Sequence, residues 1–309
     1  MKSKETAHVN LTFLLTVIMY LSVSFGISFY QSAFEKSVPF PALILLSQFA
    51  LFLFPFLYAV RSGHFAEKTG LRPISFGTVV LVVLMIICLE PLLTFVNALS
   101  QCFVESPTTD MIIEQATHYG FLQMFFLVAL LPAFCEEIVY RGVFFQTYGK
   151  VSVIPGALLS ALLFGAMHGN LNQFAYAFLM GFAFALVVYA TKSLFASMLM
   201  HLTVNGLSTI LVFAMRESDA LKEAVEQTDK VQMTVPYVLK NYGLIALFGT
   251  CLACVLFKAI AQKCGTWDDI CKSFRAKNKF RMFLRLFTVP LVTALVVMMA
   301  LMILSELAG

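Results

Sequence analysis

The chain has 309 residues, of which 60% are hydrophobic and only 12% are charged. The charged share is about half that of an ordinary soluble domain, and the mean hydropathy is +0.87. This composition excludes a soluble two-domain protein, because too few polar side chains are available to cover its surface. The net charge of +4 is interpreted as a membrane-orientation signal, and no nucleic-acid partner is expected.

Several apolar stretches are about 20 residues long or longer, enough to cross roughly 30 Å of hydrocarbon as helix. The predicted spans are Val9–Phe29, Pro39–Val60, Phe76–Leu99, Gly120–Gln146, Val153–His168, Leu171–Ala190, Leu194–Met215, Tyr242–Ile260 and Leu286–Leu307. The predicted fold class is therefore all-α, a polytopic transmembrane helix bundle of about nine spans (eight to nine) in a lipid bilayer. The least distinct boundary is the sequence GNLNQ, between the fifth and sixth spans.

The distribution of Lys and Arg predicts a cytoplasmic N-terminus. With nine alternating spans, 16 of the 21 Lys and Arg residues lie inside and five outside, as the positive-inside rule expects. Ser100–Tyr119 contains no Lys or Arg and fits an outer loop, and Glu217–Lys230 is expected to be an exposed outer helix or loop. The basic run Lys272–Arg285, which follows Trp267, fits a cytoplasmic interfacial helix that touches anionic lipid. We expect an integral protein of a bacterial plasma membrane.

Seven cysteines provide no disulfide framework. Cys251 and Cys254 form a CxxC pair, but this pair lies inside an apolar span with no histidine nearby. A zinc or redox site is therefore not expected there.

Ionisable side chains inside the spans mark the candidate site. A charge at the centre of a bilayer costs roughly 2.5–3.5 kcal/mol on insertion scales, so such residues usually face the bundle interior and serve a function. The ionisable residues that stand out within the spans are Glu90, Glu136, Glu137, Arg141, His168 and His201.

The fourth span carries three of these groups in the sequence FCEEIVYRG. Glu137 and Arg141 are four residues apart, so they share a helix face and can pair. Glu136 is rotated by about 100° from Glu137, and its partner must come from another helix. A buried ion pair that stabilises the bundle would explain Glu137 and Arg141, but it would not explain Glu136. Two adjacent carboxylates repel each other, and a carboxylate in that position is suited to act as a general base.

Two further spans bring polar groups to a similar depth. In a hairpin that turns at Gly149–Ser152, Glu136 and His168 both lie roughly 20 Å from the turn. His201 and Asn205 share one face of the seventh span, on the same side of the membrane. A structural histidine and interhelical hydrogen bonding are the simpler explanations for each residue alone. Their convergence favours an active site within the membrane, toward the cytoplasmic half.

Three motifs occur in a fixed order within this region. They are EExxxR at Glu136–Arg141, FxxxH at Phe164–His168 and HxxxN at His201–Asn205. In this order and spacing the sequence resembles the CPBP family of intramembrane proteases, also called the Abi or type II CAAX prenyl endopeptidase family. The resemblance covers about Gly120–Met215. It divides the chain into peripheral N-terminal helices (1–119), a catalytic core (120–215) and C-terminal helices with a basic loop (216–309).

The resemblance implies endoproteolysis of a membrane-anchored or prenylated protein or peptide. It implies that Glu136, helped by His168, activates a water, while His201 and Asn205 donate hydrogen bonds to the oxyanion. Glu137, within the same catalytic set, and Arg141 would hold the fourth helix in register.

Three alternatives remain open from the sequence. Glu136, His168 and His201 could bind zinc with an open fourth position, but no HExxH motif is present, and a metal-free mechanism is favoured. The protein could instead be a non-enzymatic membrane scaffold or bacteriocin-immunity factor. It could also be a proton-coupled transporter, in which Glu90 beside Pro91 would serve transport, although no internal repeat is present.

Overall fold

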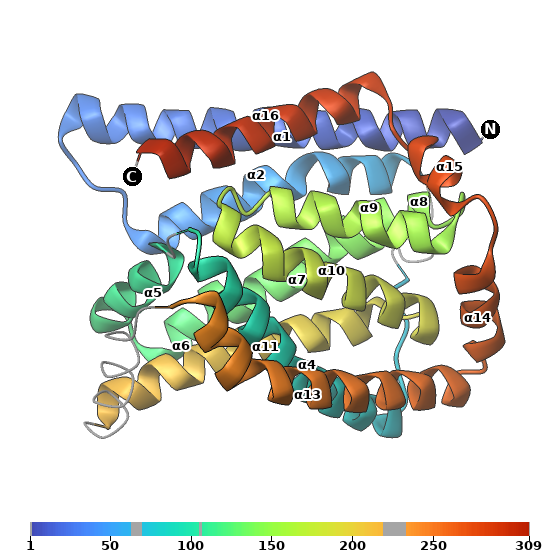
Figure 1. Ribbon diagram of the computed structural model, residues 1–309. Helices are drawn as coiled ribbons and strands as arrows, with labels where there is room; N and C mark the ends of the chain where they lie inside the picture. Colours follow the sequence, from blue (N-terminus) through green and yellow to red (C-terminus); the bar gives the residue numbers. More distant parts are fainter. Residues whose placement is uncertain (1, 63–69, 105–106, 219–232, 309) are drawn as a thin grey trace.

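The computed structural model describes residues 2–62, 70–104, 107–218 and 233–308, and within these ranges it is a bundle of helices without β-strands (Figure 1). The helices before the central one are α1 (Lys2–Phe34), α2 (Phe40–Arg61), α4 (Phe76–Gln101) and α5 (Pro107–His118). Those after it are α9 (Val153–Ala166), α10 (Leu171–Thr191), α11 (Leu194–Glu217), α13 (Val235–Lys263), α14 (Trp267–Arg275), α15 (Lys279–Leu284) and α16 (Val289–Ala308).

Eight helices within the described residues are long and apolar enough to cross a membrane. The predicted all-α membrane bundle of eight to nine spans is therefore confirmed, while its N-terminal orientation stays a prediction. The fifth predicted span is the exception. Its helix, α9, has only 14 residues, which corresponds to about 21 Å and is shorter than a bilayer core.

The chain reverses direction after α9 in the sequence GNLNQ. Gly169 adopts a left-handed conformation with φ of 74°, which glycine reaches without steric cost. The Asn170 side chain then accepts a hydrogen bond from the Gln173 backbone N–H at 2.7 Å and caps α10. His168 therefore lies in a turn beyond the end of α9, not inside a span as predicted.

The central helix runs from Phe121 to Tyr148 and changes its winding twice. It consists of α6 (Phe121–Met124), η1 (Phe125–Leu130), α7 (Leu131–Glu137), η2 (Ile138–Phe145) and α8 (Gln146–Tyr148), in which η1 and η2 are π-helical. π-Helical turns interrupt α-helices mainly at functional sites. The two acidic residues of the EExxxR motif close α7, between the two wide segments.

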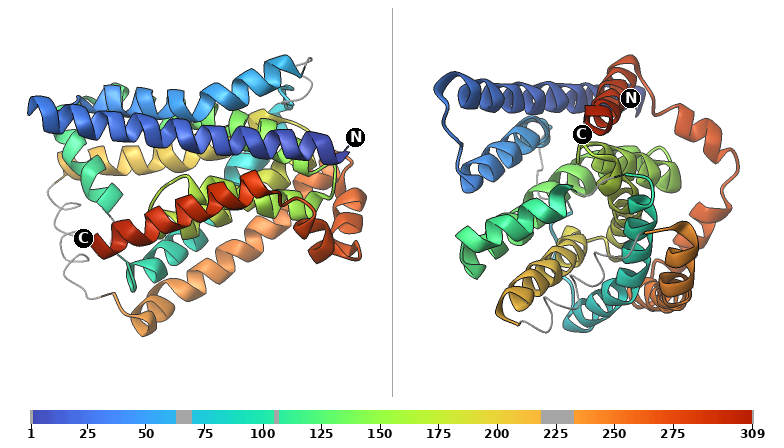
Figure 2. Two further views of the ribbon diagram at one scale, coloured as in Figure 1. Left: turned by 90° about the horizontal axis from the view of Figure 1, so that it is seen from above. Right: turned by 60° about the vertical axis from the view of Figure 1, so that its left-hand side comes forward.

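The first and last helices, α1 and α16, pack against each other on one side of the bundle (Figures 1 and 2). Asn10 of α1 is fully buried there. Its side-chain nitrogen donates to the Leu286 carbonyl at 2.7 Å, and its side-chain oxygen accepts from the Tyr148 hydroxyl at 2.7 Å. One amide thus connects α1, the central helix and the segment before α16.

On the other side, α13 packs closely along α4. A Cβ atom added at Gly249 would collide with the Cys88 carbonyl oxygen of α4, so this contact requires glycine. Cys251 and Cys254 are exposed on α13.

Three predicted connecting segments have different outcomes. The predicted outer loop Ser100–Tyr119 contains the helix α5, to which α11 is joined by a hydrogen bond from Arg216 Nη1 to the Ala116 carbonyl at 2.9 Å. The basic run Lys272–Arg285, predicted as one interfacial helix, is divided between the end of α14 and α15, and its contact with lipid stays a prediction. Figures 1 and 2 show α14 and α15 at the same end of the bundle as the start of α1. The third segment is Glu217–Lys230, of which residues 219–230 lie outside the described residues.

Candidate active site

A polar cluster lies where the central helix contacts α2, α9 and α11. α7 packs against α2 and α11, and η2 packs against α9, α10 and α11. These contacts bring side chains from four separate helices or their ends together. The predicted convergence of the fourth, fifth and seventh spans is present in the structure.

Glu137 and Arg141 form the predicted ion pair. Arg141 Nη1 lies 2.7 Å from Glu137 Oε1, and both side chains are fully buried. The guanidinium carbon also lies 4.2 Å from the ring centroid of Phe164 and 5.1 Å from that of Phe184. Aromatic faces attract a desolvated cation, so the rings help to stabilise this buried charge. Gly181 of α10 provides the space, since a Cβ there would lie 2.9 Å from Arg141 Nη2.

His201 lies between the two glutamates. Its Nδ1 is 3.0 Å from Glu137 Oε1, and its Nε2 is 3.9 Å from Glu136 Oε2. Since the Glu137 carboxylate can only accept, Nδ1 carries the proton of this hydrogen bond. Glu137 therefore fixes the orientation of the ring and directs Nε2 toward Glu136.

Glu136 has a different environment from Glu137. Its side chain remains 14% exposed, whereas that of Glu137 is fully buried. Its Oε1 accepts a hydrogen bond from Gln48 Nε2 of α2 at 2.9 Å. The partner of Glu136 thus comes from another helix, as predicted, but the partner is neutral. Glu136 is consequently the more accessible of the two carboxylates.

His168 is held at the edge of the cluster by Phe164, the first residue of the FxxxH motif. Its Nδ1 lies 2.8 Å from the Phe164 carbonyl. A carbonyl oxygen only accepts, so Nδ1 carries a proton, and in the neutral ring Nε2 is an acceptor. The Phe164 ring packs edge-on against both His168 and His201, with centroid distances of 4.8 and 5.9 Å. One aromatic side chain therefore contacts both histidines.

Asn205 contacts the backbone of the central helix. Val128 lies in the π-helical segment η1. Asn205 Nδ2 donates to the Val128 carbonyl at 2.9 Å. The contact matches the interhelical hydrogen bond that was the simpler explanation for Asn205. It occupies one of the two hydrogens of the amide nitrogen.

Sequence reasoning missed Gln48, although a signal was present. Gln48 and Ser47 are the polar residues within the otherwise apolar stretch from Phe40 to Ala59, and a polar side chain in a span is a reason to look for a buried partner. Phe184 and Gly181 carried no such signal, because an aromatic residue and a glycine are common in any membrane helix.

Zinc binding by Glu136, His168 and His201 is the less favoured alternative from the sequence. Among the residues that the structure describes, no three His, Cys, Asp or Glu side chains are grouped as metal ligands. The metal-free mechanism stays a prediction.

The fold and the cluster define an integral membrane protein with a buried acid–histidine–arginine site. Residues 118–207 match the family model of the type II CAAX prenyl endopeptidase Rce1-like proteins. The family predicted from the motifs is thereby confirmed, and the chain is Rce1-like over this region.

Two bacterial proteins are similar to parts of the chain. The membrane-embedded CAAX protease MroQ of Staphylococcus aureus is 28% identical over 131 residues, which are 40% of this chain and 51% of MroQ. The putative membrane peptidase YdiL of Bacillus subtilis is 28% identical over 89 residues, which are 28% of this chain and 36% of YdiL. The chain thus spans about half or less of the relatives it matches. No solved structure matches it.

Proposed function

We propose that this protein is an intramembrane endopeptidase in which Glu136 activates a water molecule against a peptide bond. The observation that carries the proposal is the difference between two adjacent carboxylates. Glu137 is fully buried and engaged by Arg141 and His201, whereas Glu136 keeps some exposure and a neutral partner. A general base must reach the proton that it abstracts, and Glu136 is the carboxylate able to do so.

In the proposed reaction, Glu136 takes a proton from water as the water oxygen bonds to the scissile carbonyl carbon. The C–N bond of the resulting tetrahedral intermediate then breaks, and Glu136 returns the proton to the leaving nitrogen. The products are a carboxylic acid and an amine, and one water is consumed. His168, whose Nε2 is an acceptor in the neutral ring, would help to orient the water.

His201 would stabilise the oxyanion from Nε2. Because Nδ1 already donates to Glu137, donation from Nε2 requires the imidazolium form. One oxyanion donor is worth about 3–4 kcal/mol in other hydrolases.

The substrate class that we propose is a membrane-anchored or prenylated protein or peptide. The description of the matched family and the position of the cluster among membrane-spanning helices support this class. We further propose a bacterial plasma membrane and a site in its cytoplasmic half. The organisms of the two relatives support the first, and the excess of Lys and Arg on one side supports the second.

The test is a comparison of membrane peptides from cells that carry either the wild-type chain or Glu136→Gln, in a strain whose own copy is deleted. We expect cleavage fragments of one or more membrane proteins with the wild type and uncleaved precursors with the variant. Identical peptides from both strains, together with full biological activity of the variant, would favour the scaffold function instead. Activity that a chelator abolishes and zinc restores would overturn the metal-free mechanism.

A further inference from the structure

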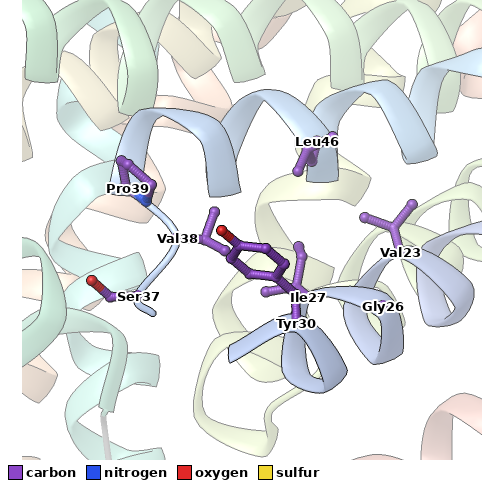
Figure 3. A pocket seen from close by; sticks show the side chains of 8 residues that line it. All are labelled: Val23, Gly26, Ile27, Tyr30, Ser37, Val38, Pro39 and Leu46. Carbon is purple, nitrogen blue, oxygen red and sulfur yellow. The ribbon is translucent and has the colours of Figure 1, made fainter. Parts of the chain in front are cut away.

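A side chain from outside the matched family region reaches the proposed base. Gln48 lies on α2, well before residue 118, and α2 is placed between α1 and the central helix. Leu46 lines a cavity of about 480 Å³ that α2 forms with α1 (Figure 3). Gln48, two positions later, is rotated by about 200° and faces α7. The two faces of α2 therefore have different neighbours.

The hydrogen bond between Gln48 and Glu136 orients the carboxylate without neutralising it. Gln48 Nε2 donates to Glu136 Oε1 at 2.9 Å, and a hydrogen bond to an ionised acceptor is among the stronger ones. An arginine at this position would add a positive charge, as Arg141 does beside Glu137. The amide of Gln48 adds none. The bond thus fixes geometry and leaves the carboxylate free to accept a proton.

The orientation of the amide follows from the same contact. A carboxylate only accepts, so the nitrogen of the amide must face Glu136. The amide oxygen Oε1 is then buried and has no hydrogen-bond partner among the described residues. A buried, unpaired acceptor is costly. The contact with Glu136 therefore determines which way the amide faces.

We propose that Gln48 is the positioning residue for Glu136. By holding Oε1, it leaves Oε2 as the oxygen that takes the proton from the attacking water. Oε2 is also the oxygen that faces His201 Nε2, at 3.9 Å, so the base and the oxyanion donor are directed to one place. This inference rests on the proposed function, since it requires Glu136 to be the base.

The test is steady-state cleavage by purified protein in liposomes, with the membrane-anchored peptide that the comparison above defines as substrate. Gln48→Met has a similar length but no donor. We expect it to lower kcat on the order of 10²-fold with an unchanged KM, because a loosely held base is misplaced for the reaction. Gln48→Asn, which keeps the amide on a shorter side chain, should retain an intermediate kcat. Gln146→Met on α8, also at a half-buried glutamine, is the matched control and should cleave like the wild type.

The outcomes separate this inference from the function on which it rests. Wild-type kcat in Gln48→Met, with Glu136→Gln inactive, would overturn the positioning role alone. A raised KM with unchanged kcat would also overturn it, because Gln48 would then bind substrate. Cleavage by Glu136→Gln would overturn both proposals. If the unfolding midpoint of Gln48→Met falls below that of the wild type, kcat is compared at a temperature at which both proteins are fully folded, and wild-type kcat there would overturn the role.

Discussion

The central helix and α1 are nearly equal in hydropathy but differ in what surrounds them. The most apolar windows of Phe121–Tyr148 and α1 have mean hydropathies of 1.8 and 1.9, yet 50% of the first and 22% of the second are buried inside the protein. The buried helix carries Glu136, Glu137 and Arg141. α1 presents large apolar side chains such as Ile18, Phe25 and Phe29 to its exposed surface. Charge is thus tolerated in this bundle where protein groups replace lipid.

The largest loss of stability is expected from breaking the buried ion pair between Glu137 and Arg141. Arg141→Met would leave Glu137 as a buried charge without its cation, and removal of one partner of such a pair typically costs about 3–5 kcal/mol. We expect a loss of this size in the free energy of unfolding, measured by titration from mild detergent into SDS.

The matched control is the exposed pair between Lys150 and Glu5, whose atoms lie 2.6 Å apart. Exposed pairs contribute about 0–1 kcal/mol, so Lys150→Met should change little. Equal effects of the two substitutions would contradict the view that burial gives the central pair its importance.

A smaller loss is expected from filling the space at Gly181. A Cβ there would lie 2.9 Å from Arg141 Nη2 and 3.1 Å from the Ala161 backbone. Overpacking of this kind costs roughly 1–3 kcal/mol, so Gly181→Ala should lower the unfolding midpoint and the cleavage rate together. Gly26→Ala is the control. A Cβ at Gly26 meets no atom within 4 Å, and alanine favours helix, so this variant should be at least as stable as the wild type.

The smallest effect is expected at Asn205. Asn205→Leu removes the donor to the Val128 carbonyl, and hydrogen bonds between membrane helices contribute about 0.6–1.7 kcal/mol. If Asn205 is structural, Asn205→Leu should lose stability and cleavage together. A variant that keeps the wild-type unfolding midpoint but does not cleave would instead assign Asn205 to the oxyanion, as the family resemblance implies.

The sequence predicts the membrane helices well because hydrophobic length is a local property. Besides the central helix, seven of the nine predicted spans coincide with helices that are long enough to cross a membrane. The Glu137–Arg141 pair follows from helical spacing. The π-helical segments and the short α9 were not predicted, since winding and capping depend on single residues such as Pro132 and Gly169. Gln48 was missed because its partner is 88 residues away, a contact that only packing reveals.

Cleavage of the identified membrane-anchored peptide by purified protein in liposomes tests the central claim most directly. If Glu136 is the base, Glu136→Gln should cleave on the order of 10²–10⁴-fold more slowly than the wild type, with an unchanged unfolding midpoint. Undiminished cleavage by this variant would contradict the account.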